Sequence, residues 1–504
     1  MLKEPWVEAG VALYLGDCLE VLPGLEANRF HAIVTDPPYG LEFMGQEWDA
    51  PWKYGMQAFG FKDGKSRNPG PSFTSTRNPM CKVCHKHKRG SKSHTPCTCE
   101  MPQFDELDHR LADMAKFQAW CTTWATECLR VAKPGAYMLV FGGTRTWHRL
   151  VCAIEDAGWE IRDTLMWVYS SGFPKSLSVD KAIDKAAGAE RKVVGKYHPP
   201  EQPEWNLKQA KDPDAEAAPG SFTASGRRTL DVTAPATDAA KQWEGWGTAL
   251  KPAWEPILLC RKPLDGTVAA NTLKQRCGGL NIDACRVGYE SEADKASATP
   301  QGRCTSKDSG AIGAEPDAGR DMERVEFQRP PLRGRWPANL ILDGSEAVLS
   351  CFPQSKGQQG GVKGTEPSHT GDENGATYGE YGRIPSLKRG DAGSAARFFK
   401  SCPYGPEDEE ALRLIYCSKA SRSERRKGLP QDVRADHPTV KPQALLRYLC
   451  RLICPPDGEI LDPFVGSGST IVAAIADGFR ACGIDSDRHY LLDLAIPRAK
   501  HALK

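Results

Sequence analysis

The tetrapeptide Asp36-Pro37-Pro38-Tyr39 combines residue types that suit the capture of a planar amine. It follows an apolar run at 32–34. An apolar run that ends in an acid is typical of a buried parallel strand, whose C-terminal edge is where open α/β sheets bind ligands. The two prolines stiffen the backbone and remove two N–H donors, so carbonyl acceptors remain. This set favours binding of a flat ring with an exocyclic NH2 group, and the alternative is an ordinary proline turn after a core strand.

A second chemical signal lies near the other end of the chain, in the sequence DPFVGSGST at 462–470. The residues around it predict a strand at 458–462, a helix at 471–477 and a strand at 480–484. Gly466 and Gly468 let the backbone approach a ligand that the helix N-terminus faces. Asp485 follows Gly466 by 19 residues, where an acid accepts hydrogen bonds from ribose hydroxyls.

The residues of this glycine loop discriminate between nucleotide-like ligands. The usual dinucleotide pattern needs a third glycine where this chain has Ile471. Asp462, directly before the loop, would repel a pyrophosphate and would suit an ammonium group. The chain also lacks a complete G-x-x-x-x-G-K-S/T phosphate loop. The loop therefore favours S-adenosylmethionine over NAD, FAD or ATP.

The regular elements that would position both motifs lie at the two ends of the chain. Periodicity predicts a strand at 11–15, a helix at 104–128, a strand at 136–141, a helix at 146–156, a strand at 159–169 and a helix at 442–454. Asp17 follows the first of these strands, and it could also be a plain helix N-cap. Strands from both ends must share one sheet if the tetrapeptide is to meet the glycine loop.

The composition describes a large protein with reduced thiols and no membrane signature. Its 504 residues allow about two to four domains. Because 66 Lys and Arg face 64 Asp and Glu, a nucleic-acid partner has to be sought in local patches. We find no apolar run of about 18 residues and no signal-peptide core. The 18 cysteines are scattered, which is typical of a cytoplasmic protein.

A cysteine-rich stretch predicts a structural metal site. Cys81 and Cys84 form a C-x2-C pair, and Cys97 and Cys99 form a C-x-C pair after twelve intervening residues. This is close to zinc-knuckle spacing. The residues between the pairs are basic and include no acid, which favours phosphate contact. The alternatives are an exposed loop whose thiols bind nothing and a solvated run of charges.

The β-α alternation stops after residue 169, and a segment rich in proline and glycine follows. Short apolar islands remain inside it, for example at 256–260 and 339–342. A loop-rich segment of this size is typical of a recognition region or a lid. We therefore divide the chain into catalytic parts at 1–45 and 102–170, an insertion with the cysteine loop at 46–101, a target-recognition region at 171–434 and a cofactor-binding part at 435–504.

Three motifs together resemble those of the DNA amino-methyltransferases: DPPYG at 36–40, HPTVKP at 437–442 and DPFVGSGST at 462–470. A catalytic motif that precedes the glycine loop is the order of the β class of that family. The blocks GWGTALKP at 245–252 and RWPAN at 335–339 are similar to phage-borne and prophage-borne members. The resemblance implies a doubly wound, Rossmann-like sheet that binds S-adenosylmethionine, built from both chain ends with a large inserted recognition region.

The resemblance also implies roles for individual residues. Asp36, Pro37, Pro38 and Tyr39 would form the catalytic element, in which Asp36 and the Pro37 carbonyl accept the N–H hydrogens of a flipped-out base and Tyr39 stacks on its ring. The expected cofactor-binding residues are Asp17, Lys441, Asp462, Phe464, Gly466, Gly468, Thr470 and Asp485. For Lys441 the alternative is a solvated residue at a helix start. Trp167 and Phe173 are candidates for the other face of the base pocket, and Trp167 fits the core equally well.

The favoured hypothesis is site-specific N6-methylation of adenine in duplex DNA, in the cytoplasm of a bacterial or phage-infected cell. The rival within the class is N4-methylation of cytosine, and the family leans to Asp at the first motif position for adenine and to Ser for cytosine. Less favoured are methylation of RNA or of a protein Gln, and a zinc-bearing DNA-binding protein without catalysis. A homodimer is compatible with the sequence, which does not reveal whether a restriction endonuclease accompanies the enzyme.

Overall fold

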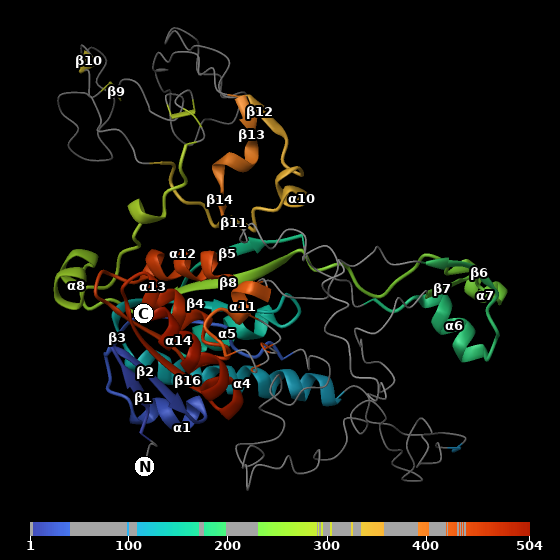
Figure 1. Cartoon of the computed structure of the whole chain (residues 1–504), viewed down its shortest axis with the longest axis horizontal. Coiled ribbons are helices and arrows are strands. Elements are labelled where there is room, and N and C mark those ends of the chain that lie inside the picture. The colour runs from blue at the N-terminus through green and yellow to red at the C-terminus, as the bar shows by residue number, and fades with distance from the viewer. Residues whose placement is uncertain are drawn as a thin grey trace, which may run out of the picture.

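The main body of the protein is a mixed α/β sheet that carries helices on both faces (Figure 1). The computed structural model describes residues 4–40, 98–99, 108–170, 176–197, 230–289, 334–356, 392–402 and 440–504, with short stretches at 291, 294–295, 303–304, 324–325, 420, 422–430, 433, 435 and 437. Within these ranges, no helix is both long enough and apolar enough to cross a membrane.

Among the described residues, ten strands form the main sheet in the order β1-β2-β16-β15-β3-β4-β8-β5-β11-β14. In that order they span Trp6–Glu8, Val11–Leu15, Arg480–Asp485, Glu459–Asp462, Phe30–Thr35, Ala132–Phe141, Trp254–Arg261, Glu160–Val168, Leu340–Leu342 and Lys400–Ser401. All neighbours pair in parallel except at β1 and β8, which run antiparallel to the strands beside them. The prediction of a doubly wound, mostly parallel sheet is confirmed.

The two ends of the chain interleave in this sheet. Strand β16 pairs with β2, so that Asp485 lies beside Leu15. Strand β15 pairs with β3, so that Leu461 lies beside Ile33. Two C-terminal strands therefore lie between two N-terminal ones. The C-terminal ends of β2, β16, β15 and β3 all point to one edge of the sheet, which brings the residues after them together.

Each face of the sheet has its own hydrophobic core. Helices α12 (Gln443–Ile453), α13 (Ser469–Ala476) and α14 (Ile496–Ala502) cover one face. Helices α1 (Cys18–Val21), α4 (Asp108–Val131) and α5 (Trp147–Asp156) cover the other. Alternate residues of β4 divide between the two cores, because successive side chains of a strand point to opposite faces. A sheet buried on both faces explains why these strands read as continuous apolar runs.

The middle of the chain takes part in the main sheet, which the division at 171–434 does not anticipate. Strand β8 lies antiparallel between β4 and β5, and β11 and β14 extend the sheet beyond β5. Seven of the eight residues of β8 are buried. The apolar islands at 256–260 and 339–342 mark β8 and β11, but a short apolar run does not reveal its pairing partner, which here lies about 90 to 180 residues away in sequence.

Short helices and two small two-stranded sheets, β9 with β10 and β12 with β13, make up most of the remaining elements outside the small lobe. They are η1 (Leu22–Gly24), α8 (Val268–Gln275), η5 (Asp283–Cys285), β9 (Arg303–Cys304), β10 (Arg324–Val325), α10 (Glu346–Leu349), β12 (Gln354–Lys356), β13 (Ala392–Ser394), η6 (Ala395–Phe398), α11 (Arg422–Arg426) and the π-helical segment η8 (Tyr490–Ala495). A cavity of about 600 Å³ opens in the region of α10, η6 and β14. No residue of the DPPY motif or of the glycine loop lines it.

A small lobe stands to one side of the sheet (Figure 1). It consists of α6 (Val179–Ala187), β6 (Val193–Tyr197), β7 (Leu230–Thr233) and α7 (Asp238–Gln242). Large apolar side chains are exposed on it, among them Trp243 and Trp246, whose rings meet edge to face at 4.9 Å. The lobe therefore does not rest on an apolar core like that of the main sheet.

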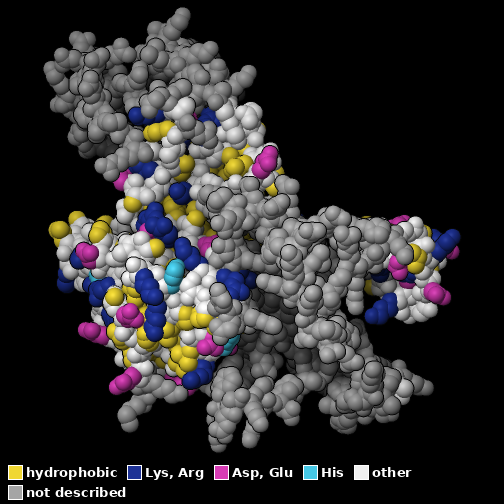
Figure 2. All heavy atoms as spheres, viewed as in Figure 1, with side chains coloured by type: hydrophobic (Ala, Val, Ile, Leu, Met, Phe, Trp, Pro, Cys, Tyr) yellow, Lys and Arg dark blue, Asp and Glu magenta, His cyan; other side chains and the backbone are white. Residues whose placement is uncertain are grey.

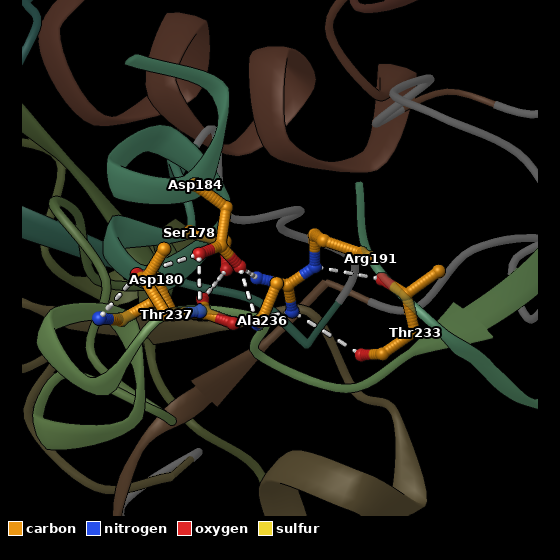
Figure 3. A network of polar contacts seen from close by, with 8 residues as sticks. Ser178, Asp180, Asp184, Arg191, Thr233, Ala236 and Thr237 are labelled. Carbon is orange, nitrogen blue, oxygen red and sulfur yellow. Dashed lines mark hydrogen bonds and ion pairs between the residues drawn. The ribbon is translucent and has the colours of Figure 1, made fainter. Parts of the chain in front are cut away.

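The interior of this lobe is a charged network centred on Arg191 (Figure 3). Its guanidinium donates to the carboxylates of Asp180, at 2.8 Å, and Asp184. Asp184 also accepts hydrogen bonds from the backbone N–H groups of Ala236 and Thr237. Burial raises the pKa of Asp184, but these hydrogen bonds, with those from the Thr237 hydroxyl and Arg191, outweigh it and lower the pKa to about 2.

Candidate active site

The candidate site lies at the edge of the sheet where β3 and β15 end side by side. The last residue of β3, Thr35, donates its hydroxyl hydrogen to Asp462 Oδ1 at 2.8 Å. Asp462 is the last residue of β15 and opens the glycine loop. The next residue after Thr35 is Asp36, so the DPPY motif and the glycine loop leave the sheet from adjacent strands.

Asp36 is held by two side chains at this edge of the sheet. The Tyr39 hydroxyl donates to Asp36 Oδ1 at 2.7 Å. The ammonium of Lys441 donates to Asp36 Oδ2, across 405 residues of sequence. The ammonium also donates to the Tyr39 hydroxyl, at 3.3 Å. Asp36, Tyr39 and Lys441 therefore form one closed hydrogen-bonded group.

Lys441 is enclosed by aromatic rings and a second acid. Its side chain is only 5% exposed. The ammonium lies 4.6 Å from the ring centre of Phe141, 5.6 Å from that of Tyr39 and 3.8 Å from Glu255 Oε2. Burial lowers the pKa of Lys441, and the Asp36 carboxylate opposes that shift. The burial excludes the alternative of a solvated lysine at a helix start.

The backbone of the DPPY motif is anchored from the turn between β4 and α5. Thr146, which precedes α5, donates its hydroxyl hydrogen to the carbonyl oxygen of Tyr39 at 2.5 Å. Thr146 itself is buried. The motif is thus held at three points: by Thr146, by Lys441 and, through Thr35, by Asp462. A rigid acceptor geometry is what the two prolines already favour.

The glycine loop requires glycine at both of its glycine positions. Gly466 and Gly468 have φ angles of +51° and +79°, in the left-handed region that other residues rarely adopt. A Cβ atom on Gly466 would lie 2.5 Å from His437 Nε2, and one on Gly468 would lie 2.9 Å from the Cα atom of Ala495. The loop is therefore packed against the HPTVKP segment on one side and against η8 on the other.

Two acids flank the loop, Asp462, which is buried, and Asp485, which is partly buried. Asp462 accepts from Thr35 and from the backbone N–H of Phe464, and Asp485 accepts from the backbone N–H groups of Gly466, at 2.6 Å, and Asp487. Burial is the main cause that raises the pKa of Asp462 to about 6 and that of Asp485 to about 7. Within the described residues neither acid forms a salt bridge. Two carboxylates of this kind, one buried and one partly buried, suit a ligand that brings a positive charge and hydroxyl donors.

Arg498 of α14 holds the glycine loop in place through hydrogen bonds. Its guanidinium donates to the Ser467 carbonyl at 2.7 Å and to the Ser467 and Ser469 hydroxyls at 3.1 and 3.2 Å. On the other side, the ring of Phe464 packs against Trp120 and Trp124 of α4, with ring centres 5.7 and 5.5 Å away. Helix α4 therefore positions the aromatic residue of the loop.

The structure brings most of the predicted site residues to one sheet edge. Asp36, Tyr39 and Lys441 meet there, as do the loop residues Asp462, Phe464, Gly466, Gly468, Thr470 and Asp485. Asp17 is close by, because the backbone N–H of Gly16 donates to the carbonyl of Asp485 at 2.9 Å. Asp17 Oδ1 also accepts a hydrogen bond from the N–H of Leu19, so Asp17 is in addition the N-cap of helix α1.

Other sequence-predicted residues have different outcomes. Trp167 is fully buried in the core and packs on Tyr169 at 5.1 Å, which supports its core reading. Phe173 lies outside the described residues, as do Cys81, Cys84 and Cys97. Cys99 is described and partly buried, and the zinc site stays a prediction.

Several contributors to the site have no assigned role from sequence. Glu255 is the acid in the apolar run of β8, and an acid inside such a run is the signal that could have singled it out. His437 opens the HPTVKP motif and packs against the glycine loop, and burial lowers its pKa to about 3. Arg425 of α11 donates to the His437 carbonyl at 2.5 Å. Thr146 and Thr35 carry no such signal, because a threonine near a strand end is common.

Comparison with known sequences identifies the family. The profile of the DNA methylase family matches residues 30–495. The type II methyltransferase M.HindIII of Haemophilus influenzae is 25% identical over 272 residues, 53% of this chain and 64% of its own length. The DNA adenine methyltransferase YhdJ of Escherichia coli is 40% identical over 60 residues, which are 12% of this chain and 20% of that protein. The chain thus spans less than two thirds of the length of these relatives.

Two solved structures align along nearly the whole chain with low scores. The PvuII DNA methyltransferase, described as cytosine-N4-specific, is 10% identical, covers 99% of this chain and 90% of its own, and has a TM-score of 0.35. The M1.HpyAVI complex with S-adenosylmethionine is 11% identical, covers 98% of each chain and has a TM-score of 0.31. The family assignment rests on the sequence profile, which extends from β3 with the DPPY motif to the segment after the glycine loop. The chain belongs to the DNA methylase family of N6-adenine and N4-cytosine amino-methyltransferases.

Proposed function

We propose that this protein transfers a methyl group from S-adenosylmethionine to the N6 amine of adenine in duplex DNA. The observation that carries the proposal is the junction of the acceptor and donor motifs. Thr35 and Asp462 are hydrogen-bonded at the ends of adjacent strands, and Asp36 follows Thr35 directly. An amine bound at Asp36 would therefore lie beside a ligand bound at the glycine loop.

The residues of the loop fit the cofactor. Its sulfonium and ammonium groups match the buried carboxylate of Asp462, and its ribose hydroxyls match that of Asp485. Asp17, at the end of the neighbouring strand β2, is the expected contact of the adenine ring. When bound, S-adenosylmethionine supplies an electrophilic methyl group on a sulfonium centre.

The acceptor residues act on the nitrogen of the base. The exocyclic amine is a poor nucleophile, because its lone pair is delocalised into the ring. Asp36 and the Pro37 carbonyl accept its two N–H hydrogens and favour a tetrahedral nitrogen, whose lone pair is available. This stabilises the transition state more than the ground state. The new N–C bond forms as the S–C bond breaks, and the nitrogen then releases one proton, for which the Asp36 carboxylate is the nearest base.

Tyr39 serves this reaction in two ways. In the structure its hydroxyl holds Asp36 Oδ1, which fixes the carboxylate for the incoming amine. Its ring is the expected stacking partner of an extruded base. Thr146 holds the Tyr39 backbone, so the ring and the carboxylate keep a constant relation.

The aspartate at the first motif position favours adenine over cytosine, because the family leans to Asp for adenine and to Ser for cytosine. Both amines would fit the same acceptors. The residues between 171 and 434 that lie outside β8, β11 and β14 are the proposed recognition region for DNA. Figure 2 shows Lys and Arg interspersed with acidic side chains on the visible face, so DNA contact would depend on local groups. Such a substrate places the enzyme in the cytoplasm of a bacterial or phage-infected cell.

A nucleoside analysis tests the proposal. Purified protein is incubated with S-adenosylmethionine and unmethylated bacterial DNA, which is then digested to nucleosides and analysed by mass spectrometry. We expect N6-methyladenine, and none with the Asp36→Ala variant. N4-methylcytosine without N6-methyladenine would refute the adenine assignment. Methylation of RNA but not of duplex DNA would refute the substrate class.

A further inference from the structure

We propose that Lys441 is a positioning residue that holds the Asp36 carboxylate ionised by balancing the charge of three acids at the site, the partly buried Asp36 and the buried Glu255 and Asp462. This inference rests on the proposed function, since it explains how Asp36 stays an acceptor for the target amine. The resemblance places Lys441 at the cofactor. The geometry points instead to the acceptor side, because the ammonium donates directly to Asp36 Oδ2.

Three acids from three separate strands surround this one ammonium. Asp36 follows β3, Glu255 lies on β8 with Oε2 at 3.8 Å, and Asp462 ends β15 and is electrostatically coupled to Lys441. Asp36 and Asp462 also act on each other as like charges. Without the ammonium, the Asp36 side chain, which is 21% exposed, would face two buried carboxylates. Like charges in such a place favour protonation of one of them.

The other charged and titratable groups around Asp36 do not replace Lys441. Tyr39 donates a neutral hydroxyl to Oδ1. His437, on the HPTVKP segment, has its pKa lowered to about 3 by burial and is neutral near pH 7. Arg425 is hydrogen-bonded to the His437 carbonyl, and Arg498 is engaged by Ser467 and Ser469. Lys441 is thus the cation in direct contact with Asp36 among the described residues.

The protonation state of Asp36 decides its chemistry. An ionised carboxylate only accepts hydrogen bonds, and each oxygen has a second acceptor site for the substrate amine beside Lys441 and Tyr39. A protonated carboxyl carries an O–H donor that would oppose an N–H of the amine. The rings of Phe141 and Tyr39 stabilise the ammonium in place, as cation–π contacts do. Lys441 therefore acts on the amine through Asp36.

The test measures the single-turnover rate of methyl transfer between pH 6 and 9, with cofactor and DNA saturating. We expect Lys441→Met to slow transfer at least about tenfold at pH 7, because only a minor fraction of Asp36 would then be ionised. Each pH unit changes such a minor fraction about tenfold. The rate should recover as the pH rises. Lys441→Arg should keep the wild-type profile, and Lys116→Met, at an exposed site on α4, is the matched control.

A second substitution separates charge balance from simple structural damage. Glu255→Gln removes one of the competing negative charges. In the Lys441→Met background it should move the acid limb of the pH profile back toward that of the wild type, and alone it should move that limb to lower pH. A structural role of Lys441 would give no such rescue. Thermal melting and cofactor binding verify that each variant is folded.

The outcomes divide clearly. A Lys441→Met enzyme with the rate and pH profile of the wild type would overturn the inference. So would a loss that is equal at every pH and is not relieved by Glu255→Gln. A wild-type protein that methylates no DNA contradicts the proposed function instead, since every comparison here is made relative to an active wild-type enzyme.

Discussion

Thr35 and Asp462 are joined by a hydrogen bond of 2.8 Å, although 427 residues separate them in the chain. One ends the strand that leads into the DPPY motif, and the other ends the strand that leads into the glycine loop. Both side chains are buried. This contact joins Asp462, the expected cofactor-binding acid, to β3, the strand that leads into the acceptor motif. A substitution at Thr35 should therefore alter cofactor binding.

Substitution of Thr35 by Val should weaken cofactor binding. The hydroxyl favours the ionised form of Asp462, and a hydrogen bond of this kind contributes about 0.5–1.5 kcal/mol, which corresponds to a loss of affinity of about twofold to thirteenfold. Thr35→Ser keeps the hydroxyl and is the matched control. Isothermal titration with S-adenosylmethionine at pH 7 measures both. Equal affinities for wild type and Thr35→Val would show that this contact does not act on the cofactor site.

Cofactor affinity should rise with pH between about 5.5 and 8. Burial raises the pKa of Asp462 to about 6 and that of Asp485 to about 7, so both acids are largely protonated at pH 5.5 in the ligand-free protein. A cationic ligand and its hydroxyls bind better to the ionised forms, which appear as the pH passes these values. Below the pKa of one such acid the affinity should fall about tenfold per pH unit.

The same two acids give the sign of a stability effect in the ligand-free protein. Their folded-state pKa values lie above the usual range for Asp near 3.9, so the folded state binds more protons than the unfolded state at intermediate pH. Their contribution to stability is therefore present at low pH and is lost as the pH rises through about 6 and 7. Asp485→Asn removes one acid and should flatten this dependence in melting curves recorded between pH 5 and 8.

Removal of Arg191 should loosen the small lobe without affecting the main sheet. In Arg191→Leu the buried acids Asp180 and Asp184 lose their only shared cation among the described residues, and buried unpaired acids oppose folding. Hydrogen exchange should accelerate in α6, β6 and β7 while β3 and β4 stay protected. Lys192→Leu, at the adjacent exposed position, is the control. Unchanged protection in Arg191→Leu would mean that other contacts hold the lobe.

The cysteine pairs give a metal prediction that concerns residues outside the described part of the chain, apart from Cys99. Their spacing predicts one zinc ion per chain, bound by Cys81, Cys84, Cys97 and Cys99. Metal analysis of protein purified without chelator should find one equivalent, and Cys81→Ser with Cys84→Ser should abolish it. A protein that contains no zinc after expression in zinc-supplemented medium would refute the site.

Local sequence patterns predict much of the α/β frame. Buried runs such as 11–15 and 136–141 became strands because their side chains are apolar on both faces, and the helix at 442–454 became α12 because its leucines recur on one side. The long helix α4 begins and ends a few residues from its predicted bounds, and β4 starts before Pro134-Gly135, where the left-handed Gly135 is accommodated inside the strand.

The strands and side-chain contacts from the middle of the chain could not be predicted from local sequence patterns. β8 is antiparallel between two parallel neighbours, and nothing in an eight-residue run encodes which strands it will join. Glu255 follows the first residue of this strand, so its meeting with Lys441 depends on that placement. The buried ion network of Arg191 is likewise distributed over segments that pair only when folded.

The sequence by itself determined which chemistry is present: an acid, two prolines and a tyrosine after one apolar run, and a glycine loop between two acids after another. These signals are local, since each depends on a few neighbouring residues. Only the tertiary structure decided that Lys441 contacts Asp36, that Thr35 joins Asp462 and that Glu255 faces the same ammonium. The Thr35–Asp462 contact depends on β15 pairing with β3, and the approach of Glu255 to Lys441 depends on β8 lying beside β4. Strand order is a property of the whole sheet that no single segment encodes.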